Sequence, residues 1–470
     1  MSFTTPAFLV LFAATCLLYF NLRRGGQNVV VLAAGLIFYG WWDWRFLFLI
    51  FATTGADYVC AILIQESTSE RRRTVFLAVV LAINLGTLGL FKYLDFFAQS
   101  ASDLIRYFGG TPNLVLLHVV LPLGISFYTF HALSYAIDVY RRRTEAERNY
   151  LIYLSYVMFF PLLVAGPIER AWHLIPQFKV DRHVTAGKVW SGLLLCAAGF
   201  VKKIVIADNV AVMANYGFDR ASATGALHLL AIYAFAIQIY CDFSAYSDIA
   251  RGSARILGFD VFQNFELPYL TTNPRDFWRA WHISLSSWFR DYVYIPLGGN
   301  RGSRAQTLRN LAITMLLCGL WHGAAWIFVL WGAFHGVMFA VYDVWSRSRV
   351  GQWVSARRGA LAHTMKCLVF FQFVCLGWLL FRADSPSQAM HMLRSIAFNF
   401  SPDVTTGYLA LRLALFAVPL LLVQIYQRRY GMAPWDHWRV ESKVMALCAA
   451  TLFITLVGAP NRTQFIYFQF

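Results

Sequence analysis

The sequence consists largely of apolar runs of about 20 residues, the length that crosses the hydrocarbon core of a bilayer. Of its 470 residues, 59% are hydrophobic and 14% are charged, a composition far from that of a soluble domain. The sequence therefore predicts an all-α polytopic membrane protein with about 11 transmembrane helices. The apolar runs are 5–22, 28–41, 46–64, 75–98, 114–138, 187–207, 225–249, 362–381, 408–427 and 443–458.

The basic residues indicate how these spans are oriented. A formal net charge of +16 suggests nucleic-acid binding in a soluble chain, but here the basic residues lie in short alternate loops, as the positive-inside rule expects. We therefore expect no nucleic-acid partner, a retained first span with the N-terminus outside, in the periplasm, and cytoplasmic basic loops. The basic clusters are Arg23–Arg24, Arg71–Arg73, Arg141–Arg143, Arg347–Arg358 and Arg428–Arg429.

Two apolar stretches are awkward in length for straight spans. Region 150–186 contains Pro161, Gly166, Pro167 and Pro176, which interrupt a helix. Irregular backbone at membrane depth is tolerated only inside protein or along a cavity, so we expect a re-entrant element there.

Region 309–345 is short for two full crossings and a turn. It predicts a short hairpin that bends at or just after Gly323, with His322 inside the membrane. An ionisable group in a span is a candidate functional residue, and small neighbours leave room beside this histidine. Those small residues are equally typical of helix packing. His335 lies 13 positions later, on another side of a continuous helix, so we interpret it as a supporting or packing residue.

A second candidate region runs from Thr271 to Gly302. Asn273 is a predicted cap, and Pro274 suits the first turn of a helix over 274–290. That helix would carry a largely aromatic side and, opposite it, a cationic side with a histidine. The alternative is an interfacial helix that meets lipid phosphates. The residues of the cationic side are Arg275, Arg279, His282 and Ser286.

Asp242 and Tyr246 are neighbours one helical turn apart in a third region. A carboxylate at membrane depth needs a partner, and we expect Asp242 to pair with an Arg or Tyr in a polar network, or to take part directly. The eight cysteines form no CxxC motif and are interpreted as packing residues. His173, His282 and His322 lack metal-ligand spacing, so neither a metal nor another bound cofactor is expected.

These motifs resemble the membrane-bound O-acyltransferase superfamily, in particular its bacterial alginate O-acetyltransferase and teichoic-acid D-alanyltransferase branch. The resemblance implies a ring of transmembrane helices with re-entrant elements around a central tunnel, in one domain over 1–470. Within it we expect N-terminal spans over 1–110, a catalytic core over 114–345 and C-terminal spans over 362–470. The motifs are FPLLVAGPIER (160–170), YCDFSAYSDIARGSARILGF (240–259), WHISLSSWFRDYVYIPLGGNRG (281–302), LWHGAAWIFVLWGAFHG (320–336) and FIYFQF (465–470).

The resemblance also implies a chemistry. His322 takes the place of the family's invariant histidine and His282 that of its second conserved polar position. A histidine can accept the proton of a hydroxyl that attacks a thioester. We expect a bacterial inner-membrane O-acetyltransferase that moves acetyl groups from cytoplasmic acetyl-CoA toward an exported polysaccharide such as alginate. A separate periplasmic esterase-like acetyltransferase is the expected partner.

Three alternatives stay open at this stage. The first is transfer of D-alanine or another acyl group to a cell-wall polymer. The second is a transporter or acyl conduit whose histidines relay protons, although no repeated halves are evident in the sequence. The third is an inactive scaffold of a polysaccharide-export complex.

Overall fold

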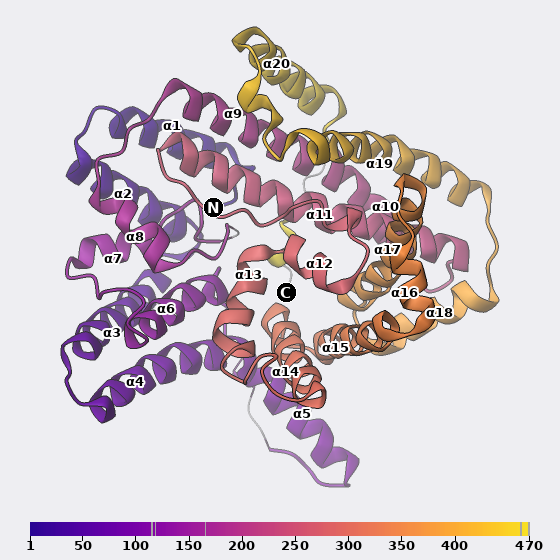
Figure 1. Cartoon of the computed structure of the whole chain (residues 1–470), viewed down its shortest axis with the longest axis horizontal. Helices are drawn as coiled ribbons and strands as arrows, with labels where there is room; N and C mark the ends of the chain where they lie inside the picture. The colour runs from indigo at the N-terminus through magenta and orange to yellow at the C-terminus, as the bar shows by residue number, and fades with distance from the viewer. Residues whose placement is uncertain (114–115, 118, 165, 461–462, 469–470) are drawn as a thin grey trace. The chain divides into compact units, whose positions relative to one another are not determined.

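The computed structural model describes residues 1–113, 116–117, 119–164, 166–460 and 463–468, and within these ranges it contains helices and no strand. Figure 1 shows the helices along the chain. Parts of three predicted segments lie outside the described residues. They are residues 114–115 and 118 of the run 114–138, residue 165 of the motif 160–170, and residues 469–470 of the terminal motif.

Contacts divide the chain into two compact units. Unit 1 comprises Met1–Leu193 and Ile249–Phe262, and unit 2 comprises Leu194–Asp248 and Gln263–Phe470. The predicted division into 1–110, 114–345 and 362–470 stays a prediction. Unit 1 contains the first part of α9, the last part of α11, and α1 (Pro6–Tyr19), α2 (Arg24–Asp43), α3 (Phe46–Glu66), α4 (Glu70–Leu88), α5 (Leu94–Tyr107), α6 (Ile125–Tyr140), α7 (Tyr150–Val157) and α8 (Ala171–Lys179).

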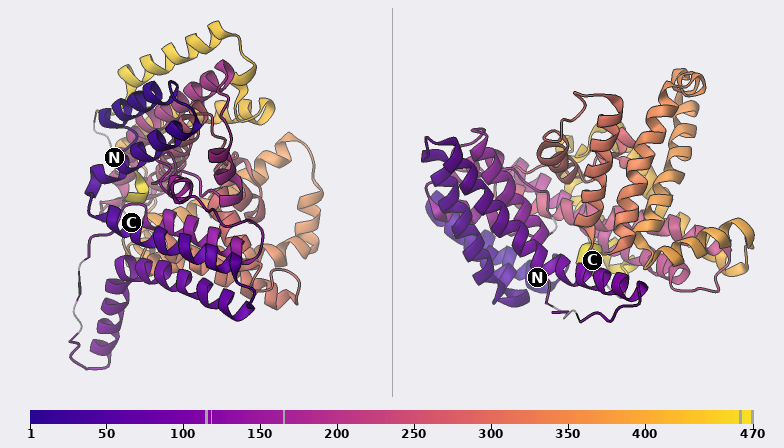
Figure 2. Two further views of the ribbon diagram at one scale, coloured as in Figure 1. Left: turned by 90° about the vertical axis from the view of Figure 1, so that its left-hand side faces the viewer. Right: turned by 90° about the horizontal axis from the view of Figure 1, so that it is seen from below.

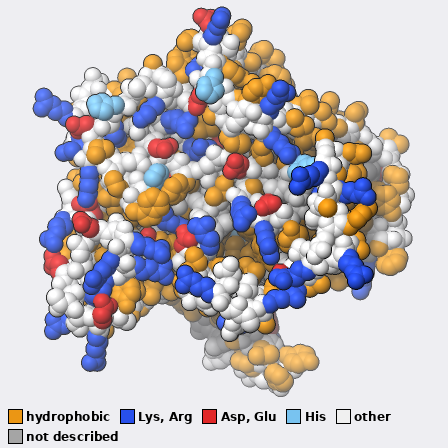
Figure 3. Space-filling model, in the orientation of Figure 1, with side chains coloured by type: hydrophobic (Ala, Val, Ile, Leu, Met, Phe, Trp, Pro, Cys, Tyr) orange, Lys and Arg blue, Asp and Glu red, His pale blue; other side chains and the backbone are white. Residues whose placement is uncertain are grey.

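Unit 2 contains the remaining helices. In Figure 2, α15 (Trp326–Arg347) and α17 (Ala360–Arg382) run side by side, and Figure 3 shows Lys and Arg side chains spread over the face that it draws. The helices are α9 (Ala186–Phe200), α10 (Asp208–Phe218), α11 (Gly225–Ile256), α12 (Pro274–Ala280), α13 (Ile283–Phe289), α14 (Arg304–His322), α15 (Trp326–Arg347), α16 (Arg349–Ala356), α17 (Ala360–Arg382), α18 (Pro386–Phe398), α19 (Val404–Tyr430) and α20 (Val440–Val457).

The described residues also form short helical segments. Three π-helical turns continue or join α-helices, and the others are single 3₁₀ turns. They are η1 (Gly89–Tyr93), η2 (Val201–Ala207), η3 (Pro268–Leu270), η4 (Arg290–Tyr294), η5 (Pro434–His437) and η6 (Ile466–Phe468).

The polytopic membrane character predicted from the sequence is confirmed. Among the described residues, eight helices are long and apolar enough to cross a membrane, and α1 is apolar but shorter. The total of about 11 spans stays a prediction. The eight are Phe46–Glu66, Glu70–Tyr107, Ala186–Phe218, Gly225–Ile256, Trp326–Arg347, Ala360–Arg382, Val404–Tyr430 and Val440–Val457.

The predicted helical hairpin is present, but it runs from Arg304 to Arg347 and is not short, because α15 is long enough to cross a membrane. α14 ends at His322, α15 begins at Trp326, and the connection starts at the predicted Gly323. A Cβ atom on Gly319 would lie 2.2 Å from the backbone oxygen of Phe328 in α15. Gly319 therefore allows close packing of the two helices, as the alternative interpretation held for this residue.

The broken backbone predicted within 150–186 is also present in unit 1. α7 ends at Val157 and α8 begins at Ala171, and the described residues between them are non-helical and buried. One detail was wrong, because Pro176 lies inside α8 rather than interrupting it. That the broken segment within 150–186 is re-entrant in a bilayer stays a prediction.

The hairpin generates a test of topology. Arg304 Nε at the start of α14 lies 2.6 Å from the Asp343 carboxylate near the end of α15, so both ends of the hairpin are on one side. In a cysteine-free background, single cysteines replacing Arg309 and Arg347 should react with an impermeant thiol reagent only from the cytoplasm. A cysteine in the segment 382–407, which contains α18, should react from the periplasm.

Permeabilised cells provide the control that each cysteine is reactive. Periplasmic labelling at position 347, or purely cytoplasmic labelling of the segment 382–407, would contradict this topology.

Candidate active site

His322, the last residue of α14, is enclosed by aromatic side chains within unit 2. Its side chain is 3% exposed, and its Nε2 lies 4.0 Å from Cys318 Sγ one turn earlier. This shell excludes most water, which strengthens any hydrogen bond that the imidazole makes there. The ring centroids 4.9–5.6 Å from the imidazole are those of Trp321, Trp331, Phe381 and Tyr467.

His282 combines a strained backbone with complete burial. It lies between α12 and α13 in the left-handed conformation, with φ 42° and ψ 55°. It is 0% exposed, and neither ring nitrogen has a hydrogen-bond partner among the described residues. The backbone strain costs about 1–3 kcal/mol, and unsatisfied buried polar atoms add to the cost. This combination is typical of functional sites.

The continuous helix predicted over 274–290 is wrong, because it breaks at His282. The predicted cap is confirmed, since Asn273 Oδ1 accepts a hydrogen bond from the Asp276 amide. Hydrogen bonds to a residue earlier in the chain hold the backbone at this break. Asn264, which is buried, accepts the amide of Ile283 at its backbone oxygen, at 3.0 Å. Its side-chain oxygen accepts the next amide, that of residue 284, at 3.2 Å.

The break separates residues that were predicted to share one face. His282 is buried, whereas the Arg279 side chain is 79% exposed and pairs with the carboxylate three residues earlier, at 3.3 Å. Arg275 lies 3.5 Å from Asp343, and Ser286 Oγ donates to a backbone carbonyl at 3.1 Å. The two arginines therefore do not form one surface with the imidazole.

The C-terminal segment brings the two histidines into one cluster. The Tyr467 ring lies 5.6 Å from the His322 ring and 6.3 Å from the His282 ring. Trp321 likewise contacts both, at 5.0 and 5.8 Å. Phe243 of α11 completes the cluster, 4.5 Å from both His282 and Tyr467. The two histidines selected from the sequence thus share aromatic neighbours.

A buried ionic cluster holds this C-terminal segment in place. Lys203 Nζ lies 2.7 Å from Asp242 and 2.8 Å from Asp208, and it donates to the backbone oxygen of Thr463 at 3.0 Å. The Ile466 amide donates to Asp242 at 2.7 Å. Asp242 therefore has a charged partner as predicted, but the prediction of an Arg or Tyr partner was wrong.

Tyr246, the other predicted member of the network, stacks on Phe465 at 4.1 Å. Both predicted network residues thus contact the C-terminal segment. Sequence reasoning missed Lys203 and Tyr467. Lys203 lies in the apolar run 187–207, where the rule for intramembrane charges could have identified it. Tyr467 lies in the quoted terminal motif, but nothing in its spacing indicates contact with the histidines.

His335 is connected to the cluster through Trp331. The Trp331 ring lies 4.5 Å from His335 and 4.9 Å from His322, and Trp278 of α12 contacts His335 at 5.0 Å. The supporting or packing role of His335 stays a prediction.

The motif 160–170 forms a separate polar cluster in unit 1. Glu169 is 0% exposed, and its carboxylate lies 2.7 Å from His173 Nδ1. Burial raises the pKa of Glu169, and the hydrogen bond to Glu169 raises the pKa of His173. The second carboxylate oxygen accepts the Phe262 amide, so this cluster ties α8 to the segment after α11.

No group of three or more His, Cys, Asp or Glu residues that could hold a metal occurs in the described part of the chain. The expectation of a metal-free site stays a prediction. The cluster in unit 2 provides two buried imidazoles in an apolar shell, an arrangement suited to moving a proton and donating a hydrogen bond.

Comparison with known proteins identifies the family. The family model for MBOAT, the membrane-bound O-acyltransferase family, matches residues 141–381, a range that includes both histidines. The chain belongs to this family. It is an O-acyltransferase, and the transporter and scaffold alternatives are set aside.

Three relatives show the range of acceptors in this family. The probable alginate O-acetylase AlgI of Pseudomonas aeruginosa is 40% identical over 404 residues, 85% of this chain and 75% of the relative. The peptidoglycan O-acetyltransferase of Helicobacter pylori is 32% identical over 427 residues, 84% of this chain and 79% of the relative. The teichoic acid D-alanyltransferase of Bacillus subtilis is 26% identical over 270 residues, 55% and 68% of the two chains.

The ionic cluster yields a stability prediction. Lys203→Met leaves Asp208 and Asp242 buried without their cation, so the variant should lose about 3–5 kcal/mol of unfolding free energy. The adjacent Lys202→Met is the matched control. Lys202 pairs with Asp248 at 2.6 Å, but both side chains are partly exposed rather than fully buried, so the loss in this variant should be smaller. Thermal unfolding in detergent, followed by tryptophan fluorescence, measures both. Equal losses would contradict the prediction.

Proposed function

We propose that this acyltransferase moves acetyl groups from cytoplasmic acetyl-CoA toward an exported polysaccharide of the alginate class, across the bacterial inner membrane. The names of two relatives, an alginate O-acetylase and a peptidoglycan O-acetyltransferase, support acetyl as the group and a glycan as the acceptor. The observation that carries the proposal is the shared aromatic cluster of His282 and His322 in unit 2.

His322 is proposed as the general base. It accepts the proton of an acceptor hydroxyl while that oxygen forms a bond to the thioester carbonyl carbon. The tetrahedral intermediate then collapses, the carbon–sulfur bond breaks, and the imidazolium returns the proton to the leaving thiolate. Burial of His322 supports this role, because water would otherwise compete as the acceptor.

His282 is proposed to orient the donor or to stabilise the oxyanion. A neutral imidazole carries one N–H, and both nitrogens of His282 lack a partner among the described residues. A donor without a competing internal partner can stabilise charge that develops on the carbonyl oxygen. Binding of substrate would also remove the cost of leaving these buried nitrogens unsatisfied.

Binding of the CoA phosphates is assigned to Arg275 and Arg279, with Ser286 as a weaker candidate. Arg279 is the better placed of the two arginines, since its side chain is 79% exposed and, among the described residues, only Asp276 pairs with it. Arginine suits phosphate because its planar guanidinium donates two hydrogen bonds at once. An anchor to lipid phosphates is the competing interpretation.

A periplasmic esterase-like acetyltransferase is proposed to complete the transfer outside, with the N-terminus on the same, periplasmic, side. Acetyl-CoA is cytoplasmic and an exported glycan is outside, so a site within the membrane is accessible to a substrate from each face. Transfer of D-alanine is the alternative, and it is supported by the name of the more distant relative. Purified protein supplied with labelled acetyl-CoA or with a D-alanyl thioester would distinguish the two.

His322→Ala should abolish acetyl transfer, with a loss of at least the ~10²–10⁴-fold that general-base catalysis contributes. Alanine is a good helix former, so expression and membrane insertion should be retained. Turnover of labelled acetyl-CoA by purified protein measures the effect. His391→Ala, at an exposed position on α18, is the matched control and should keep full turnover. Turnover of the His322 variant near that of the wild type would overturn its assignment.

Replacement of both Arg275 and Arg279 by Gln should raise the KM for acetyl-CoA and lower saturating turnover less, because uniform binding of the donor is lost. Steady-state kinetics at varied acetyl-CoA concentration measures this. Arg290→Gln removes another exposed arginine that pairs with a neighbouring aspartate, at 2.8 Å, and should leave the KM unchanged. An unchanged donor KM with altered lipid dependence would favour the interfacial-anchor interpretation.

A further inference from the structure

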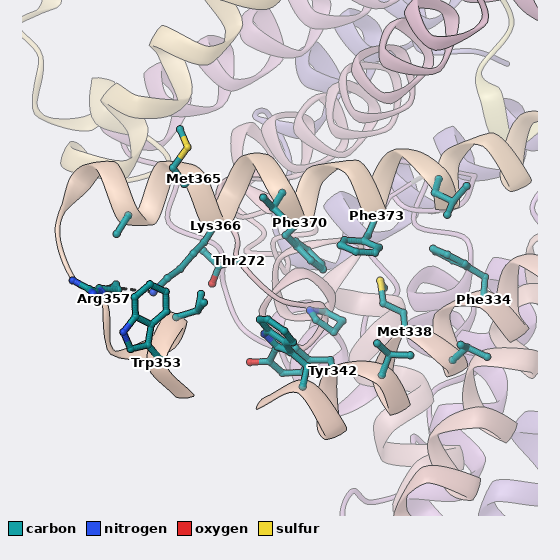
Figure 4. Close-up of a pocket in the computed structure, with 18 residues that line it drawn as sticks. Thr272, Phe334, Met338, Tyr342, Trp353, Arg357, Met365, Lys366, Phe370 and Phe373 are labelled. Carbon is teal, nitrogen blue, oxygen red and sulfur yellow. Dashed lines mark hydrogen bonds between the residues drawn. The ribbon is translucent and has the colours of Figure 1, made fainter. Parts of the chain in front are cut away.

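A groove of about 720 Å³ lies in unit 2 against α15, α16 and α17, with Thr272 and Pro274 at the start of α12 also in its wall. Figure 4 shows its lining side chains. α15 and α17 are both candidate membrane spans, so the walls of the groove belong to segments that face hydrocarbon. It is separate from the histidine cluster, since neither His282 nor His322 lines it.

One end of the groove is cationic and the other end is apolar. At one end Arg357, Lys366 and Trp353 lie close together, while Phe334 and Phe373 lie at the other (Figure 4). Phe334 and Trp345 of α15, both in the lining, lie eleven positions apart, which corresponds to about 16 Å of helix. The groove therefore matches an elongated molecule that is apolar along most of its length and polar at one end.

The polar end is cationic and lacks acidic residues. Among the groove-lining residues, all of which the structure describes, there is no Asp or Glu. Arg357 lies over the Trp353 ring, 4.4 Å from its centroid, and no carboxylate lies within ion-pair distance of it in the described part of the chain. Lys366 Nζ donates to the backbone oxygens of Ser355 and Arg357, at 3.3 and 2.9 Å. Neither cation is therefore neutralised by a carboxylate of the groove lining.

We propose that this groove binds an anionic glycerophospholipid of the surrounding bilayer, with an acyl chain along α15 and α17 and the phosphate at Arg357 and Lys366. Tryptophan beside the cations is typical of the membrane interface, and Trp353, whose ring lies under Arg357, is 60% exposed. The positive charge selects an anionic headgroup over a neutral one.

A lipid fits these observations better than another occupant. A partner helix would meet a wall that offers two cations and no acidic group. A bound donor nucleotide would leave most of the apolar length of the groove unfilled. The lipid would also contact Thr272 and Pro274, next to the Asn273 cap of α12, and would brace that helix start. This inference does not depend on the acyl group that is transferred.

The test measures lipid selection by the purified protein. Wild-type protein is incorporated into bilayers with equal amounts of phosphatidylglycerol and phosphatidylcholine, extracted gently, and analysed by native mass spectrometry. We expect retained lipid to be enriched in phosphatidylglycerol. Arg357→Gln should lower that enrichment about five-fold, since one basic residue near the surface contributes about that much attraction.

Two variants complete the design. Arg358→Gln removes the same charge from the adjacent residue, which does not line the groove, and should retain wild-type selection. Val341→Trp fills the apolar part without changing charge, at a position that is 60% exposed, and should reduce retention of both lipids. Selection that is unchanged in Arg357→Gln, or equal losses in both arginine variants, would overturn the proposal. So would displacement of the lipid by free CoA, which would identify a donor site instead.

Discussion

The arrangement of the candidate site depends on one buried cation. Lys203 lies between Asp208 and Asp242 and also binds the backbone of Thr463. Burial of three charges is favourable only when each has close partners, so the carboxylates and the C-terminal backbone fix one another. This anchoring also affects the candidate site, because the same C-terminal segment places Tyr467 beside the two histidine rings.

A second long-range constraint sets the position of the other histidine. His282 has no glycine or proline beside it, and its left-handed backbone is unfavourable in isolation. Asn264 compensates by accepting two successive backbone amides just after the break, while its side chain donates to Ser247 of α11 at 3.0 Å. The strained conformation is thus stabilised by hydrogen bonds to a residue almost 20 positions earlier, and the imidazole is directed into the aromatic cluster.

These two constraints explain which features of the fold and of the candidate site could be predicted from the sequence and which could not. Helix positions follow from apolar length and from local caps such as Asn273, and the hairpin bend follows from Gly323 in the middle of a long apolar stretch. His322 could be identified from the sequence because an ionisable group in an apolar segment is energetically costly and therefore indicates a functional residue. The break at His282 and the insertion of Tyr467 depend on partners far along the chain, so no local pattern could indicate them.

The arginines of unit 2 differ in how readily they can bind an anion, because they differ in their ion-pair partners. Asp343 binds Arg275, Arg304 and Arg347 at 3.5, 2.6 and 3.2 Å, which joins the starts of α12 and α14 to the end of α15. An arginine held in such a network has to share its charge when it binds an anion, so Arg275 is the weaker of the two arginines proposed to bind phosphate. Within the described part of the chain, Arg279 pairs only with the neighbouring carboxylate of Asp276. A phosphate can compete with that exposed pair, whose net strength in water is small.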